Sequence, residues 1–594
     1  MFTNEGRLNP AELLRLTGEM QRDHFDFSWS GKAAAKRKAF SPTTAALRYD
    51  EARSVNPDMA GGNCIIEGEN LEVLKLLLCA YRGQVKCIYI DPPYNTGNDF
   101  VYKDNFAEGT SAYWEHTGVT QDGVKMSTNT RADGRFHSNW LNMIYPRLLV
   151  ARQLLREDGV IFVSIDDNEV THLRKVMDEV FGEANFVACI VWQKKYAVSG
   201  DDPGVAAMHD YLLCYACTEK FERGLLPRTE KQLVRYTNLD NDSRGDWSSD
   251  NYVSNKSKEE RPTLWYPIKH PKTGESVWPD EHAVWRYSKE KHEQNEKEGR
   301  LYWGPDLSYK KPRLKRYLNE IQDGVVPSTW WPFTECGHND EAQKETTSLF
   351  GDRVFSTPKP VRLLKRILQI SVAGNDLVLD FFSGSGALGQ AVLEMSVERN
   401  TSLDFILVQV PELVDIKSAT YEAGFKKISD ITIERVKRVI QGYGDNPQPI
   451  DTGFKVFTLE KSAFPRADFA PDPDASAEQN LKALKAFIAQ KETNLFSQPD
   501  APAVRDEVLL KCGFQLDVQL TPVTEVTANQ LYRATDQQTP PRQAIVCFDT
   551  SLDTTTLEWL RQQKGQRVIL LEAALDTTAK WNLRHALGDE LTVF

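Results

Sequence analysis

Short apolar runs alternate with helical patterns in this chain, and this alternation constrains its fold more than any other feature. Residues 86–90 (KCIYI) and 160–165 (VIFVSI) have the pattern of buried strands, and residues 69–82 carry apolar side chains at a helical period. Strand-like runs return at residues 377–382 (LVLDFF) and 405–410 (FILVQV). Strands that alternate with helices predict an α/β fold. We expect a doubly wound, mostly parallel sheet assembled from two separate stretches of chain.

An insert separates these two stretches. Residues 221–350 are polar and charged, yet they contain seven of the thirteen tryptophans, which favours a separate domain with an aromatic core. Residues 450–480 are rich in Pro, Asp and Gln, which is typical of a linker. We therefore predict five regions: an N-terminal extension at 1–59, one half of the sheet domain at 60–220, the insert at 221–350, the second half at 351–450, and a linker with a small C-terminal α/β domain at 451–594.

The charge argues against a chain that coats nucleic acid with a uniformly basic surface. There are 72 Lys and Arg against 84 Asp and Glu, a net charge of −12. Residues 441–594 hold 15 basic against 21 acidic residues, whereas residues 221–350 hold 21 against 22. The acidity is thus concentrated in the tail. The insert retains a local basic cluster, formed by Lys310, Lys311, Arg313, Lys315 and Arg316.

The sequence shows no signal for export, membrane insertion or metal binding. No apolar run reaches the roughly 18 residues of a membrane span, and the N-terminus has no apolar core behind basic residues. The nine cysteines include one CxxC, Cys214 and Cys217, with no second pair to complete a metal site. We predict a cytoplasmic, reduced, metal-free protein without a membrane partner.

A glycine turn follows one predicted strand, where ligands of doubly wound sheets bind. Gly384 and Gly386 lie in DFFSGSG, between that strand and a predicted helix. Glycine lets a ligand approach the backbone closely, but tight strand–helix turns also use this pattern for packing. The turn lacks the Lys-Ser/Thr ending of a phosphate-binding loop. A ligand with a carboxylate or a ribose fits at least as well as a triphosphate.

A second turn, residues 91–94 (DPPY), is more specific. Pro92 and Pro93 stiffen the chain after a buried strand, since each fixes φ and removes a backbone donor. Asp91 and a backbone carbonyl can accept the two hydrogens of an amino group while Tyr94 stacks on the ring that bears it. The alternative interpretation is a Pro-Pro turn with a structural aspartate and a tyrosine packed in the core.

DPPYNTG followed by FSGSG resembles the DNA methyltransferases that methylate amino groups with S-adenosylmethionine, in the circularly permuted order of their β group. Further resemblance lies at 139–147 (NWLNMIYPR), 158–169 (DGVIFVSIDDNE), 209–215 (HDYLLCY) and 355–360 (FSTPKP). The long insert and GFKVF at 453–457 are most similar to the Mod subunits of type III restriction–modification systems. The resemblance implies a Rossmann-like methyltransferase fold, with residues 221–350 as the target-recognition domain. It also implies duplex DNA as the substrate, adenine N6 as the acceptor, and base flipping.

The resemblance also assigns roles to residues. Asp91 and the Pro92 carbonyl would accept the N6 hydrogens, with Pro93 and Tyr94 completing the turn. Cofactor binding would involve Glu69, Thr357, Lys359, Asp380, Phe382, Gly384, Gly386, Gln409 and Glu412. Gln409 stands where the family has an acid that binds the ribose, and Glu412 follows three residues later as a substitute. The basic cluster at 310–316 would contact phosphates.

The resemblance favours a homodimer that works with a separate Res subunit. No GxxxxGK[ST] phosphate loop occurs, so ATP hydrolysis by that route and DNA cleavage would belong to the partner. Four alternatives stay open: cytosine-N4 methylation, methylation of a protein glutamine, a DNA-binding subunit without catalysis, and a solitary methyltransferase without a restriction partner.

Overall fold

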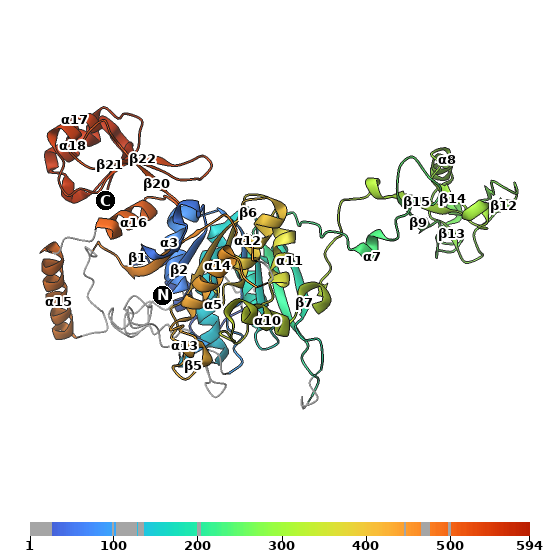
Figure 1. Cartoon of the computed structure of the whole chain (residues 1–594), viewed down its shortest axis with the longest axis horizontal. Coiled ribbons are helices and arrows are strands. Elements are labelled where there is room, and N and C mark those ends of the chain that lie inside the picture. Colours follow the sequence, from blue (N-terminus) through green and yellow to red (C-terminus); the bar gives the residue numbers. More distant parts are fainter. Residues whose placement is uncertain are drawn as a thin grey trace, which may run out of the picture. The chain divides into compact units, whose positions relative to one another are not determined.

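The computed structural model describes residues 27–97, 100–101, 127–128, 136–198, 204–444, 447–464, 476–496 and 501–594. Residues 1–26 of the predicted N-terminal extension therefore lie outside it. The chain divides into two units (Figure 1). The first comprises Met1–Arg223 and Ser328–Phe594, and the second is Gly224–Pro327.

A ten-stranded sheet forms the centre of the first unit. Its order is β1-β19-β2-β18-β17-β3-β6-β8-β7-β16. The strands are β1 (Ala45–Val55), β2 (Cys64–Glu67), β3 (Val85–Ile90), β6 (Leu155–Ile165), β7 (Phe186–Gln193), β8 (His209–Ala216), β16 (Trp330–Trp331), β17 (Leu377–Asp380), β18 (Asp404–Gln409) and β19 (Phe454–Lys461). All neighbours from β19 to β6 pair in parallel, while β1 and β8 are antiparallel to the strands beside them.

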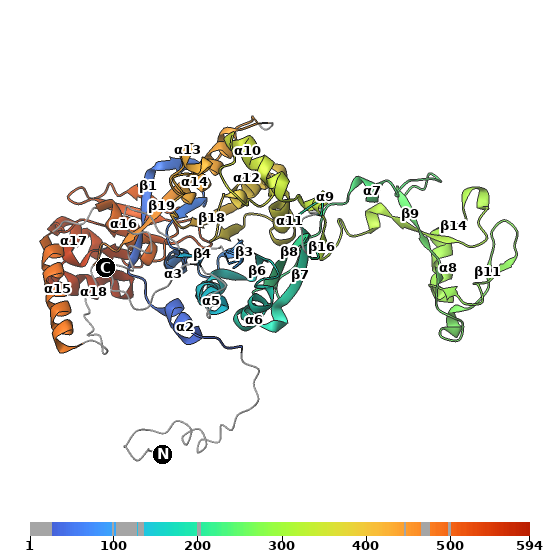
Figure 2. The ribbon, with the colours of Figure 1, turned by 90° about the horizontal axis from the view of Figure 1, so that it is seen from below.

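Helices cover both faces of this sheet (Figure 2). One layer contains α3 (Asn70–Tyr81), α5 (Phe136–Leu154) and α6 (Val170–Phe181), and the other contains α11 (Val361–Ser371), α12 (Ala387–Arg399) and α14 (Ile428–Gln441). Because both faces are covered, the central strands are buried along their length and mostly apolar: all six residues of β3 are buried, Lys86 among them. The prediction of a doubly wound, mostly parallel α/β sheet is confirmed.

The two stretches of α/β pattern meet in the middle of the sheet. β17 lies between β18 and β3, with Leu379 paired to Ile88. Parallel strands end at the same edge, so the turn after β3 and the turn after β17 are neighbours, although almost 290 residues separate them in sequence. This pairing brings the DPPY turn beside the glycine turn.

Three strands of the sheet come from outside the two predicted halves. β1 lies within residues 1–59, β16 within 221–350 and β19 within 451–594. β19 separates β1 from β2 and pairs with both, so the segment after residue 450 first completes the sheet. Correspondingly, the second compact unit is shorter than the predicted insert, at Gly224–Pro327.

The second unit is built from short β-elements around aromatic side chains. β9 (Trp247–Asn251), β14 (Leu301–Tyr302) and β15 (Arg313–Tyr317) form a three-stranded sheet, and β10 (Val253–Ser254) pairs with β13 (Val284–Trp285). Its apolar cluster contains Tyr252, Tyr266, Ile268, Trp285 and Trp303. The unit also contains α7 (Glu230–Leu233), α8 (Lys289–Lys297), β11 (Ile268–Lys269) and β12 (Ser276–Val277).

A smaller sheet lies at the C-terminal end of the first unit, in the order β20-β21-β22-β23-β24. It is formed by β20 (Gln519–Pro522), β21 (Leu531–Thr535), β22 (Gln543–Cys547), β23 (Val568–Leu570) and β24 (Leu591–Val593), with α16 (Ala501–Lys511), α17 (Thr554–Arg561) and α18 (Thr577–Leu587). It is joined to the central domain through the Tyr81 hydroxyl, which accepts from the Leu516 N–H at 2.8 Å. Across the described ranges of the chain, no helix combines the length and apolarity that a bilayer crossing requires.

Candidate active site

The turn after β3 carries the acceptor side of the site. The Asp91 carboxylate accepts a hydrogen bond from the Tyr94 hydroxyl at 3.0 Å. The Pro93 carbonyl accepts from the Trp140 indole N–H at 2.7 Å. The Pro92 carbonyl has no hydrogen-bond donor among the residues that the structure describes. Burial raises the pKa of Tyr94 well above its usual value, with a further contribution from Asp91.

Lys359 reaches this turn from a segment 268 residues away. Its ammonium lies 2.5 Å from Asp91 Oδ2 and 5.0 Å from the centre of the Tyr94 ring. The side chain of Lys359 is 10% exposed, so the ion pair is largely shielded from water. The resemblance led us to expect Lys359 at the carboxylate of a cofactor, whereas the structure pairs it with Asp91. Thr357, expected beside it, is exposed.

Besides its partner Asp91, the Lys359 ammonium interacts electrostatically with the carboxylates of Asp380 and Asp210. Burial raises the pKa of Asp380, at the end of β17, well above its usual value, and the charge of Asp91 adds to this effect. Burial also raises the pKa of Asp210, which is partly offset by Lys359 and by Lys194, 2.5 Å away. Asp380 ends β17, and Asp210 lies at the start of β8 beside the end of the antiparallel β6, so both shifted acids lie at the edge of the sheet where functional sites are typically found.

The glycine turn after β17 is shaped by close packing. Gly384 and Gly386 have φ values of 51° and 77°, which only glycine adopts without strain. A Cβ on Gly386 would lie 3.1 Å from the Thr432 carbonyl oxygen, so α14 packs directly against this turn. Asp380 accepts from the Phe382 N–H at 2.9 Å, which holds the first residues of the turn. Phe382 is half-buried and packs against the same apolar core as Tyr94.

Gln409 and Glu412, the two candidates for a ribose contact, differ in their surroundings. The Gln409 side-chain oxygen accepts from the Gly384 N–H at 2.7 Å, so Gln409 supports the glycine turn. The Glu412 carboxylate has no hydrogen-bond or ion-pair partner within the described part of the chain, and burial raises its pKa. Glu412 is therefore the better candidate for binding a ligand hydroxyl.

Glu69 is engaged in the interior. It precedes α3, accepts from the Glu72 N–H at 2.9 Å, and pairs with the fully buried Arg147. Arg147 also donates to Asn70, whose amide donates to the Phe381 carbonyl at 2.8 Å. Glu69 thus reaches the glycine turn through other side chains.

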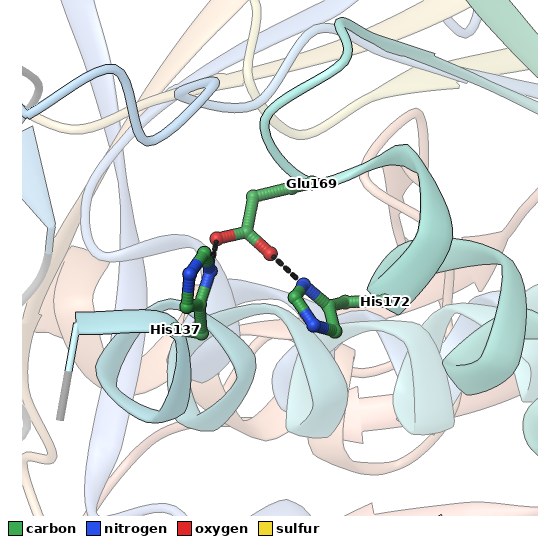
Figure 3. A group of neighbouring side chains, drawn as sticks. All are labelled: His137, Glu169 and His172. Atoms are coloured by element: carbon green, nitrogen blue, oxygen red, sulfur yellow. Dashed lines mark hydrogen bonds and ion pairs between the residues drawn. The ribbon is translucent and has the colours of Figure 1, made fainter.

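Sequence reasoning missed the residues that hold the DPPY turn in place. Trp140 on α5 binds the Pro93 carbonyl, and Asn95, which is fully buried, donates to Glu169 at 2.6 Å. Glu169 also contacts His137 and His172, which flank it in Figure 3. Asn95, Trp140 and Glu169 each lie in a segment that carries the resemblance, but those three segments are separate in the sequence, so their contacts could not be read from it.

The basic cluster of the second unit is dispersed by its local structure. Lys315 is buried and pairs with Asp240 and Asp242. Arg316 pairs with Asp250 at 2.7 Å, Lys311 pairs with Asp280 at 2.6 Å, and Arg313 donates to Ser249. Lys310 is exposed. Phosphate binding by this cluster stays a prediction, and the structure leaves Lys310 as its most available member.

Comparisons with known proteins identify the family of the chain. Residues 85–410 match the model of an N6/N4 DNA methylase family. The chain is 31% identical over 437 residues to the type III restriction-modification enzyme StyLTI Mod subunit of Salmonella typhimurium, covering 73% of this chain and 65% of that protein, slightly less than two thirds of its length. It is 31% identical to the EcoPI Mod subunit of Escherichia phage P1, covering 74% and 72%. It is 29% identical to the type II methyltransferase M.KpnI of Klebsiella pneumoniae, covering 67% and 93%.

Proposed function

Because the chain belongs to the DNA methylase family and, within it, to the Mod subunits of type III restriction-modification enzymes, we propose that it methylates adenine N6 in duplex DNA with S-adenosylmethionine. The observation that carries this proposal is the pairing of β3 with β17. It brings a turn suited to an amino-bearing base beside a turn suited to a cofactor.

The residues present fit S-adenosylmethionine. Gly384 and Gly386 leave the turn without side chains, so a ligand can approach the backbone closely. Glu412 offers a carboxylate without a partner in the described structure for the ribose hydroxyls. Phe382 offers an aromatic surface for a cation. When bound, S-adenosylmethionine supplies an electrophilic methyl group on a positively charged sulfur.

The chain's own residues would then align the acceptor. Each carboxylate oxygen can accept more than one hydrogen bond, so Asp91 can accept from N6 while it retains Tyr94 and Lys359. The Pro92 carbonyl would accept the second N6 hydrogen. Two acceptors on the amino hydrogens favour a pyramidal nitrogen whose lone pair points at the methyl carbon. Catalysis by such a site consists mainly of alignment and charge placement.

The target base must leave the duplex to reach this turn, because its amino group is otherwise paired. Tyr94 would stack on the extruded ring. Its hydroxyl is bound to Asp91 and its ring lies beside the Lys359 ammonium, so its orientation is set before the base arrives.

Nucleoside analysis tests the proposal. The purified chain is incubated with tritium-labelled S-adenosylmethionine and PCR-amplified genomic DNA, which carries no methylation. We expect the label in N6-methyladenine. Label in N4-methylcytosine would show that the acceptor is cytosine, with amino-group methylation still the reaction. The absence of labelled DNA would refute the proposal. Single-molecule sequencing of the product identifies the recognised site.

We propose that the chain forms a homodimer and acts with a separate Res subunit, as the type III relatives suggest. The type II relative favours a second candidate, a methyltransferase that acts alone, because this chain covers 93% of its length. Light scattering should give twice the 67.5 kDa of one chain for a dimer. Both candidates predict methylation by the isolated chain, so recovery of a Res subunit with the tagged chain from cells would favour the partnered enzyme, and its absence would favour the solitary one.

A further inference from the structure

A buried carboxylate lies at the centre of a group outside the predicted site. Glu169 precedes α6 and its side chain is fully buried. Oε1 lies 2.6 Å from both Asn95 Nδ2 and His137 Nδ1, and Oε2 lies 2.8 Å from His172 Nδ1. Figure 3 shows the carboxylate between the two imidazoles, which come from α5 and α6. Burying a charge is costly unless it is paired and hydrogen-bonded, so these contacts account for its presence here.

The two imidazoles and the carboxylate could also be read as metal ligands. Ligands of a zinc ion lie about 2.0–2.2 Å from the metal, which places tetrahedral ligand atoms roughly 3.3 Å apart. The nitrogen–oxygen distances of 2.6 and 2.8 Å are instead those of hydrogen bonds. Asn95 also occupies Oε1 as a third donor. The geometry favours a hydrogen-bonded carboxylate.

Two contacts from this region hold the residues on either side of Tyr94. Before it, the Pro93 carbonyl accepts from Trp140 at 2.7 Å. After it, Asn95 has a φ of 58° and donates to Glu169. His137 and Trp140 are three residues apart on α5, so they lie on neighbouring positions of one helical face. The same helix therefore binds the turn directly through Trp140 and indirectly through His137 and Glu169.

The orientation of the Glu169 side chain supports a role toward the turn. Residues at this position often cap the helix that follows, but Glu169 makes no such bond to α6. Its carboxylate is directed to Asn95, His137 and His172 instead. A left-handed backbone conformation such as that of Asn95 is maintained where the surrounding contacts fix it.

We propose that Glu169 is a positioning residue for methyl transfer: through Asn95, it holds Tyr94 and Asp91 in the geometry that receives the base. This inference rests on the proposed function. A displacement of reacting groups by about 1 Å can cost roughly a hundredfold in rate, so loss of the Asn95 contact should act on turnover. The cofactor turn after β17 is built from other residues and should be unaffected.

Glu169→Gln tests the inference, because it keeps the volume but offers only one accepting oxygen to three donors. We expect kcat on PCR-amplified genomic DNA to fall by about tenfold to a hundredfold, with KM for S-adenosylmethionine within about twofold of wild type. Glu179→Gln is the matched control. Glu179 also links α6 to α5, through the Tyr145 hydroxyl at 2.6 Å, without contact to the turn. Its kcat should stay at the wild-type level.

A compensating change separates positioning from general stability. In the double variant Glu169→Gln with Asn95→Asp, the amide and the carboxylate exchange places, and kcat should recover toward wild type. The positioning role is overturned if Glu169→Gln and Glu179→Gln lose the same activity, or if Glu169→Gln keeps the kcat of an active wild type. Either result leaves the proposed function standing. An inactive wild-type chain overturns the proposed function as well. Stoichiometric zinc retained by the wild type and lost in Glu169→Gln would assign the group to a metal instead.

Discussion

The DPPY turn and the basic segment 310–316 were both predicted as functional from short sequence patterns. In the structure, their side chains have different kinds of partners. Around the turn, distant residues converge on one place: Lys359 and Trp140 both bind it. In the basic segment, neighbours in sequence diverge. Lys315 points into the unit while Arg316 is exposed. The difference arises because side chains alternate between the two faces of a strand, so a cluster of like charges in a strand is split.

The comparison also shows where charge is already compensated. The acids near Lys315 are part of its own unit: Asp242 accepts from Lys315, Arg244 and the Tyr317 hydroxyl. Asp91 also has a cationic partner, yet it lies at an edge of the sheet where ligands bind. Position in the fold therefore makes Asp91 the stronger candidate for a functional charge, although the basic segment has the higher local charge density.

The largest expected effect concerns Asp91. Asp91→Ala removes the principal acceptor of the amino group, so methyl transfer should fall by about a thousandfold, the loss seen when one preorganised polar group is removed from an active site. Labelled transfer to DNA measures this, with calorimetry of S-adenosylmethionine binding as the control. Retained activity would show that the turn is structural and would erase the contrast with the basic segment.

Lys315→Met should affect folding. It removes the ammonium from Asp240 and Asp242, and because Asp242 keeps Arg244 and the Tyr317 hydroxyl, we expect the free energy of unfolding to fall by about 1–3 kcal/mol. Hydrogen exchange of the full chain should show faster exchange confined to residues 224–327.

Lys310→Gln is the matched comparison for Lys315→Met. It should leave hydrogen exchange unchanged and lower the salt dependence of DNA binding by about one phosphate contact. The reverse result for the two lysines would restore the segment as a continuous phosphate-binding surface.

Lys359→Met removes the ammonium from Asp91 and Tyr94. We expect kcat to fall by about tenfold, equivalent to about 1.4 kcal/mol, because the carboxylate loses the contact that orients it. Lys359→Arg should retain part of the activity. A rise in KM for S-adenosylmethionine at unchanged kcat would instead assign Lys359 to the cofactor, as the resemblance implied.

The smallest effect concerns His172. Its hydrogen bond to Glu169 raises the pKa of His172 in the folded state. A raised pKa stabilises the fold below the unfolded value of about 6.5, and this contribution is lost as pH rises through the folded value. His172→Gln should therefore lower the free energy of unfolding by less than about 1 kcal/mol near pH 6. Above the folded pKa of His172, the variant should cost even less. Urea titrations of wild type and variant, near pH 6 and above the folded pKa of His172, measure this difference. The ring centre of His137 lies 4.7 Å from that of His172, and both imidazoles contact Glu169. His137 is therefore the second residue to substitute in this test.

The sequence allowed the fold and the location of the site to be predicted. A buried strand that ends in Asp91 and another that ends in Asp380 were visible as apolar runs, and the topology of α/β sheets places such ends together. The partner of Asp91 was not predictable, because Lys359 lies 268 residues away in the sequence and no local pattern links the two. Gln409 stands where the resemblance implied an acid that binds the ribose, and its oxygen accepts from the Gly384 N–H, a contact between two strand ends that the sequence did not reveal.

The extent of the sheet was harder to predict. β19 lies just after residue 450, where Pro, Asp and Gln predicted a linker, and its pairing with β1 and β2 joins residues about 400 positions apart. Trp330 and Trp331 were counted with the insert, yet they form an edge strand beside β7. Short strands carry too little periodic signal to reveal such partners.

The second unit is connected to the rest of the chain through two segments that pair with each other. Leu226 and Val325 form an antiparallel bridge, so the chain enters and leaves this unit at adjacent points. The entropic cost of closing a loop grows slowly with its length, by about 0.6 kcal/mol for each doubling, so a long insertion at one stem is tolerated. This arrangement is compatible with insertion of the unit as one piece. Recombination at its two ends could exchange it for another of different length while every strand of the host sheet keeps its neighbours.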